Sequence, residues 1–174
     1  MVDTIIEALP DREDKSLTDV RYFYGKLIQN LSVGNQMSEE KFTLFYGNSD
    51  ATKGVFSQWH ICQFNVDGIE YNCAEQFMMA SKARLFGDKK CEEAVMEAKH
   101  PRDQKAIGRL VKPFDAGKWD SVARDLVYEG NYAKFTQNDD LKETLLSTQG
   151  TTLVEASPYD QIWGIGRGLS DPLA

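Results

Sequence analysis

The pattern of hydrophobic and polar positions changes near residue 41. The first 40 residues are polar and irregular, except for SLTDVRYFYGKLIQNL (residues 16–31), whose apolar positions recur at helical spacing. After Lys41, FTLFYG (42–47) and HICQFNVDGIEYN (60–72) are rich in aromatic and β-branched residues. Asp67-Gly68 lies between two short runs, which predicts a hairpin turn. We therefore predict an N-terminal extension over residues 1–40 that packs on a domain over 41–174, with a small β element near 42–71.

Helical patterns dominate the rest of the chain. Asn72 can cap a helix that reaches Phe86 and ends at Gly87. Further helices are predicted over 89–100, which stops before a proline, and over 101–111, 120–135 and 139–147. TTLVEA (151–156) is typical of a strand. The expected fold class is mainly α, a single domain with a small antiparallel β element, and an α+β fold is the alternative.

Composition limits the class of protein. The 174 residues suit one core, and 41% hydrophobic with 27% charged residues is ordinary for a soluble globular protein. No apolar run approaches the ~20 residues of a membrane span, and the N-terminus lacks the features of a signal peptide. We therefore expect a cytoplasmic protein. Three cysteines without CxxC spacing and two histidines argue against a disulfide framework or a histidine-rich metal centre. Chemistry without a cofactor is expected, although a carboxylate-bound Mg²⁺ stays open.

The formal net charge of −7 restricts the partners. Proteins that grip long nucleic acids by their phosphates normally present a basic face. The same charge still permits action on one extruded nucleotide, because a pocket then performs the recognition.

A glycine-rich stretch near the end of the chain, SPYDQIWGIGRG (157–168), raises the question of a nucleotide-binding loop. A dinucleotide fingerprint needs a strand before G-x-G-x-x-G and a helix after it. Only LSDPLA follows these glycines, and the chain has no GxxxxGK[ST] motif. Both nucleotide-loop interpretations are therefore rejected.

Glu75 and Lys82 are the leading candidates for chemistry. They are seven residues apart, so they lie two turns apart on one face of the predicted helix. In a pocket, burial and mutual attraction would shift their pKa values towards acid–base or amine chemistry. The alternative is structural: Asn72 and Glu75 fit a capping box, and Lys82 can extend its charge into water.

Other residues have weaker signals. Trp59, Trp119 and Trp163 each lie in polar, glycine-containing segments, where they could stack on a planar base or simply join the core. Asn131 lies three residues before a lysine, so the two could reach one ligand or be solvated together. Arg109 could clamp a phosphate or form a surface ion pair.

Together these segments resemble the NADAR (YbiA-like) family. The matching motifs run in order over residues 42 to 166: FYG (45–47), FSQW (56–59), DGIEYNCAEQFMMASKARLFGD (67–88), GR (108–109), GNYAKF (130–135), QN (137–138) and LVEASPYDQIWGIG (153–166). Arg167 departs from the apolar residue that commonly follows WGIG in the family. The first 40 residues have no counterpart in the resemblance.

The resemblance implies a mainly helical N-glycosidase whose pocket takes ribosyl nucleotides. Its implied catalytic residues are Glu75, which protonates the leaving nitrogen or activates water, and Lys82, which tunes Glu75 or forms a Schiff base. The implied ligand-binding residues are Tyr46, Gly47, Ser57, Trp59, Arg109, Trp119, Asn131, Asp160, Trp163 and Gly164. The expected substrate is ADP-ribose on the guanine amino group of nucleic acid, an antitoxin-like reversal of ADP-ribosylation. A phosphoribosylamine intermediate of riboflavin synthesis, or a non-catalytic ADP-ribose or NAD-binding module, is the alternative. The oligomeric state stays open.

Overall fold

The computed structural model describes residues 41–160 and 162–171, and these form two compact units. The predicted N-terminal extension, including its helix over 16–31, lies outside the described residues. We call residues 58–143 the helical unit, and the described residues of 41–57 and 144–171 the terminal unit. Each unit is treated by itself. Helix α8 (Asp139–Ser147), predicted with the same bounds, begins in the helical unit and ends in the terminal unit.

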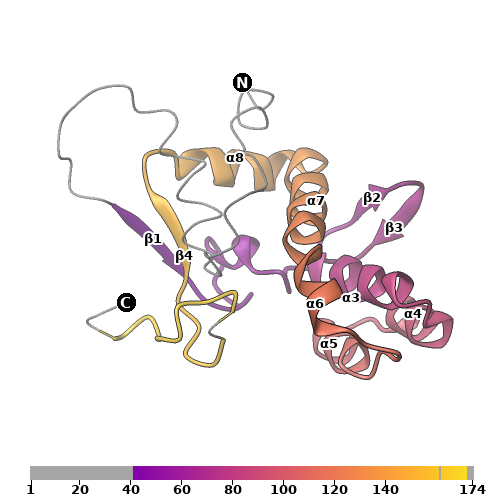
Figure 1. The fold of residues 1–174 in the computed structure, drawn as a ribbon. Coiled ribbons are helices and arrows are strands. Elements are labelled where there is room, and N and C mark those ends of the chain that lie inside the picture. The colour runs from indigo at the N-terminus through magenta and orange to yellow at the C-terminus, as the bar shows by residue number, and fades with distance from the viewer. Residues whose placement is uncertain (1–40, 161, 172–174) are drawn as a thin grey trace. The chain divides into compact units, whose positions relative to one another are not determined.

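The terminal unit is built on a pair of parallel strands, β1 (Phe42–Phe45) and β4 (Thr152–Glu155), which lie side by side in Figure 1. Phe42 is opposite Thr152, and Phe45 is opposite Glu155. The short 3₁₀ helix Gly54–Phe56 follows β1, and its Phe56 ring lies 5.6 Å from that of Phe45. The strand predicted in TTLVEA is confirmed. Its parallel pairing with FTLF was not predicted, because a parallel pair needs a long connection that local sequence does not reveal.

The helical unit opens with an antiparallel hairpin. Strands β2 (Phe64–Val66) and β3 (Ile69–Tyr71) are joined at Asp67 and Gly68, whose φ angles are 52° and 82°. Positive φ at both central residues gives a tight turn whose twist suits a hairpin, as the Asp-Gly pair predicted. The mainly helical class with small sheets is likewise confirmed.

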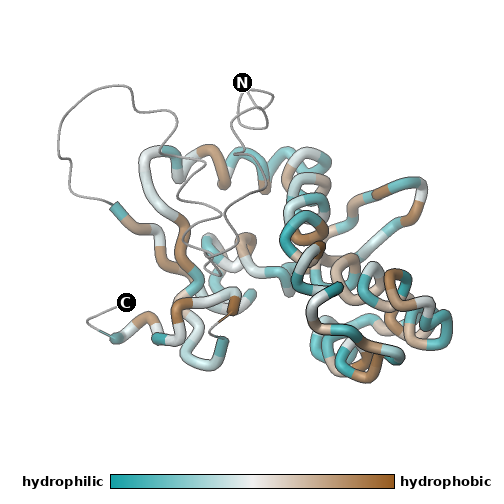
Figure 2. Tube along the Cα trace, in the orientation of Figure 1, coloured by the Kyte–Doolittle hydropathy of each residue, from teal (hydrophilic) through white to brown (hydrophobic). Residues whose placement is uncertain are grey.

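Five helices complete this unit: α3 (Ala74–Leu85), α4 (Lys89–Glu97), α5 (Pro101–Gly108), α6 (Ala116–Asp120) and α7 (Ala123–Thr136). Hydrophobic residues recur among hydrophilic ones along them (Figure 2). Helix α3 is central, with nine of its twelve residues buried and contacts to α4, α5 and α7. Glycines allow two of these approaches. A Cβ at Gly108 of α5 would lie 2.1 Å from the Met79 sulfur, and one at Gly130 of α7 would lie 2.6 Å from the Phe77 ring.

Three predicted helix limits were wrong. The helix expected over 89–100 ends at Glu97, because Ala98 is extended and the last carbonyls of α4 bond to the side chain of Gln76. The helix expected to reach about residue 111 ends at Gly108, with Arg109 as its C-cap. The helix expected over 120–135 is α7, but it begins only at Ala123, because Ser121 and Val122 separate it from α6.

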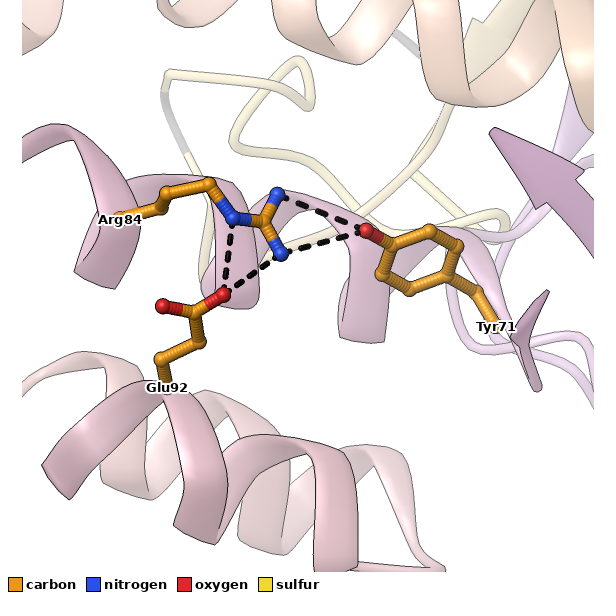
Figure 3. Close-up of polar contacts among 3 residues, drawn as sticks. All are labelled: Tyr71, Arg84 and Glu92. Carbon is orange, nitrogen blue, oxygen red and sulfur yellow. Dashed lines mark hydrogen bonds and ion pairs between the residues drawn. The ribbon is translucent and has the colours of Figure 1, made fainter. Parts of the chain in front are cut away.

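Arg84 of α3 ties two neighbouring elements together (Figure 3). Its guanidinium forms an ion pair of 2.7 Å with Glu92 of α4 and donates to the Tyr71 hydroxyl of β3 at 3.4 Å. Gln104, which is fully buried on α5, donates to Asn72 and to the Ala98 carbonyl and accepts from the Cys73 thiol. The contacts of Gln104 fix the start of α3, which carries the leading candidate residue.

Candidate active site

The capping interpretation of Glu75 is wrong, because the cap is shifted by one residue. Cys73 is the N-cap of α3 and its sulfur accepts from the Gln76 N–H at 3.4 Å. The side chain of Gln76, and not that of Glu75, reaches back to accept from the Asn72 N–H at 2.8 Å. Cys73 and Gln76 therefore take the roles that the sequence assigned to Asn72 and Glu75, and the Glu75 carboxylate makes its contacts elsewhere.

The Glu75 carboxylate is buried beside an indole. Its side chain lies in the first turn of α3, and the residue is 5% exposed. The Trp59 Nε1–H donates to Glu75 Oε2 at 3.2 Å, and the Glu75 N–H donates to the Gln58 carbonyl at 3.0 Å. A carboxylate near a helix N-terminus is also favoured by the helix dipole. The segment FSQW thus positions one candidate catalytic group.

Lys82 lies two turns further along α3, and its ammonium faces aromatic rings. Its Nζ is 4.4 Å from the centre of the Phe114 ring and 5.6 Å from that of Trp119. Burial lowers the pKa of Lys82, and the positive charge of Arg109 lowers it further. The side chain is half-buried, so it does not simply extend into water. A lowered pKa increases the fraction of neutral amine, the form that acts as a nucleophile.

Phe114 was missed in the sequence. It lies in the segment between α5 and α6 and is 48% exposed, yet it contacts both Lys82 and the Phe86 ring, 5.3 Å away. The available signal was a large aromatic residue in an otherwise polar segment, KPFDAGK. All three tryptophans are of intermediate burial, so none joins the fully buried core.

Asn131 is buried on α7 and holds a neighbour rather than facing solvent. Its Nδ2 donates to the Val127 carbonyl at 2.8 Å, so its Oδ1 is the atom that accepts from Gln58 Nε2 at 3.0 Å. That orientation leaves Gln58 Oε1 buried, without a hydrogen-bond partner among the described residues. Gln58 was also missed, although it stands between Ser57 and Trp59 in FSQW. An unsatisfied buried acceptor costs about 1–3 kcal/mol and is rare in folded proteins.

Arg109 is exposed at the end of α5, and the ion pairs among the described residues do not include it. The helical unit therefore forms two groups of candidate residues. At the start of α3, Gln58 connects Trp59, Glu75 and Asn131. Towards the end of α3, Lys82 lies with Arg109 and Trp119.

The remaining predicted residues belong to the terminal unit. Tyr46 is exposed and Gly47 has a φ of +64° after β1, while Ser57 is buried. Asp160 Oδ1 accepts from the N–H groups of Ile162 and Trp163, both at 2.9 Å, so this carboxylate organises its own loop. Gly164 is required by close packing, since a Cβ there would lie 2.8 Å from the Asp160 carbonyl oxygen.

Among residues 41–160 and 162–171, no group of three or more His, Cys, Asp or Glu side chains could hold a metal ion. No helix in the same part of the chain is long and apolar enough to cross a membrane.

The NADAR domain matches residues 44–172. The chain belongs to the NADAR family. N-glycosidase R617 of Acanthamoeba polyphaga mimivirus is 44% identical over 137 residues, which is 75% of this chain and 81% of that protein. The riboflavin biosynthesis protein PYRR of Arabidopsis thaliana is 41% identical over 81 residues, but these are 44% of this chain and 14% of PYRR. The NMR structure of Escherichia coli YbiA superposes with a TM-score of 0.62 at 30% identity and covers 71% of each chain. The family resemblance drawn from the motifs is thus confirmed.

Proposed function

We propose that this NADAR N-glycosidase cleaves the bond between ribose C1 and the guanine amino group, and so removes ADP-ribose from nucleic acid. The observation that carries the proposal is the buried Glu75 carboxylate held by the Trp59 indole on the helix that also bears Lys82. A glycosylamine needs a proton on its leaving nitrogen and stabilisation of positive charge on the sugar. One carboxylic acid that later becomes a carboxylate can supply both.

In the direct route, protonated Glu75 donates its proton to the leaving nitrogen as the C1–N bond breaks. The resulting carboxylate stabilises the oxocarbenium ion and removes a proton from the water that adds to C1. Free ADP-ribose and the restored guanine amine are the products, and Glu75 ends protonated as it began. The indole N–H of Trp59 donates to this carboxylate and orients it for the second half of the reaction.

In the covalent route, the substrate opens its ribose ring to an imine and the neutral Lys82 amine adds to C1. Guanine leaves with its amino group, a lysine Schiff base remains, and water releases the sugar. The lowered pKa of Lys82 supports this route, because burial and Arg109 favour the neutral amine. Phe114 and Trp119 cover the same amine and provide aromatic surfaces for stacking.

The substrate has one specific competitor, a phosphoribosylamine intermediate of riboflavin synthesis, which the local similarity to PYRR favours. Release of ADP-ribose or base from an oligonucleotide with ADP-ribosylated guanine and from a phosphoribosylaminopyrimidine should be compared by HPLC. We expect turnover of the first. Turnover of the second alone would assign the riboflavin reaction.

Glu75→Gln tests whether the chain is a catalyst or a binding module. We expect hydrolysis to fall about 10²–10⁴-fold, the usual contribution of a general acid–base group. Glu70→Gln, on the exposed face of the β2–β3 hairpin, is the matched control and should leave the rate unchanged. If Glu75→Gln retained both affinity and the full rate, the catalytic assignment would be wrong.

A further inference from the structure

One face of α5 carries a row of cations that the proposed chemistry does not use in full. Arg102, Lys105 and the C-cap residue Arg109 follow one another at intervals of three and four residues, so they share one side of the helix. The buried residues Pro101, Gln104 and Gly108 each precede one of these cations, so the buried side of α5 lies about 100° around the helix from them. We call Arg102, Lys105 and Arg109 the cationic face of α5.

No carboxylate in the described part of the chain forms an ion pair with these cations. The ion pairs found in residues 41–160 and 162–171 are Arg84–Glu92 and Arg167–Asp171, and neither involves the cationic face. Asp103 is the acidic residue of α5, but it projects about 100° around the helix from Arg102. Like charges at these spacings destabilise a helix by about 0.2–0.5 kcal/mol per pair. In a chain of net charge −7, such a row suggests an anionic partner.

The cationic face also borders both candidate catalytic groups. Lys105 Nζ is 5.9 Å from the centre of the Trp59 ring, and Trp59 binds Glu75. At the other end, Arg109 is close enough for its charge to act on Lys82. Arg102 lies about 10 Å from Arg109 along the helix, at 1.5 Å per residue. This span exceeds one diphosphate, so a single ADP-ribose does not account for the whole row.

We propose that the cationic face of α5 binds the phosphodiester backbone of a nucleic acid strand and holds its modified guanine at Glu75 and Lys82. This inference rests on the proposed function, since it assumes that the adduct is part of a polymer. A row of cations in line suits phosphates at regular intervals, and guanidinium groups bind phosphate in bidentate fashion. Trp59 beside Lys105 offers a flanking base a surface on which to stack.

The test compares two substrates: a short single-stranded oligonucleotide with one ADP-ribosylated guanine, and ADP-ribosylated guanosine without flanking phosphodiesters. Arg102→Gln is the informative variant, because Arg102 is exposed, whereas Lys105 contacts the Trp59 ring and the charge of Arg109 acts on Lys82. Lys90→Gln on α4 removes the same charge from an exposed lysine elsewhere in the helical unit and is the control.

We expect Arg102→Gln to lower kcat/KM for the oligonucleotide about fivefold at low salt, the upper range for one exposed ion pair. Its rate on the guanosine adduct should stay within about twofold. The slope of log kcat/KM against log salt should become shallower by about 0.7, the value for one phosphate contact in a single strand. Equal losses on both substrates, no loss on either, or the same loss in Lys90→Gln would overturn the proposal.

Binding of the unmodified oligonucleotide, measured by fluorescence anisotropy, separates the two proposals. If no adduct is hydrolysed, the proposed function is wrong. In that case, weaker and less salt-dependent oligonucleotide binding by Arg102→Gln still supports the cationic face of α5 as a nucleic acid binding surface. If hydrolysis occurs but Arg102→Gln changes neither kinetics nor anisotropy, the surface alone is wrong.

Discussion

Lys134 is a fully buried lysine on α7, and its charge makes the stability of this protein depend on pH. Burial lowers the pKa of Lys134 from 10.5 to about 8. Protonation therefore favours the unfolded chain. The penalty is complete below about pH 8, decreases as the pH rises, and disappears near pH 10.5. Each pKa unit corresponds to about 1.4 kcal/mol, so the difference amounts to about 3.5 kcal/mol.

Lys134→Met removes this titration while keeping an unbranched side chain. The free energy of unfolding should be measured in urea, by tryptophan fluorescence, for wild type and variant at pH 7, 8, 9 and 10. We expect the free energy of unfolding of the variant minus that of the wild type to fall by about 2–3 kcal/mol between pH 7 and pH 10. The reason is that Lys134 of the wild type loses its proton over this range, so burying it no longer costs stability. Titrations of groups that do not interact with Lys134 cancel in this difference, whereas those of His60 and Cys62 do not, because the charge of Lys134 acts on both. The neighbouring Cys73 thiol, with a pKa of about 12, stays protonated throughout.

Lys90→Met is the control, since Lys90 is exposed on α4. Its stability relative to wild type should stay nearly constant over the same range. If Lys134→Met gave an equally flat difference from pH 7 to pH 10, Lys134 would not carry a depressed pKa in the folded protein and the reasoning from burial would fail.

Three further predictions concern the site and the packing. Trp59→Phe keeps an aromatic ring but removes the indole donor to the Glu75 carboxylate, so kcat/KM measured by HPLC should fall about tenfold. An unchanged value would mean that the indole has no part in the proposed mechanism. Phe114→Leu removes a ring that stabilises the Lys82 ammonium, so the pKa of Lys82 should fall. The acidic limb of the pH profile of kcat/KM should then move about half a pH unit lower. A move to higher pH would contradict the contact. Gly130→Ala places a methyl against an aromatic ring of α3 and should cost about 1–2 kcal/mol in urea unfolding. Gly117→Ala, where the added Cβ makes ordinary contact, should instead stabilise by about 0.5 kcal/mol, and similar effects of both changes would refute the packing argument.

Much of the local structure follows from the sequence because its causes are local. The Asp67-Gly68 turn, the proline at the start of α5 and the bounds of α8 depend on residues within a few positions. The motifs likewise identify the family and point to Glu75 and Lys82. Helix limits that depend on distant groups were wrong, as at the end of α4, where the Gln76 side chain binds the last carbonyls.

The chemistry around the two leading residues was decided by the tertiary structure. A capping box is a pattern of spacing, and both Glu75 and Gln76 could have satisfied it. Only packing places Gln76 on the cap and Glu75 beneath the Trp59 indole, sixteen residues away in sequence. Lys82 is set by Phe114 and Arg109, which arrive from other segments, and its lowered pKa is a property of that environment. The sequence by itself determined which side chains were available and their order on each helix. Burial and long-range contacts decided which of them meet, because both depend on elements far apart along the chain.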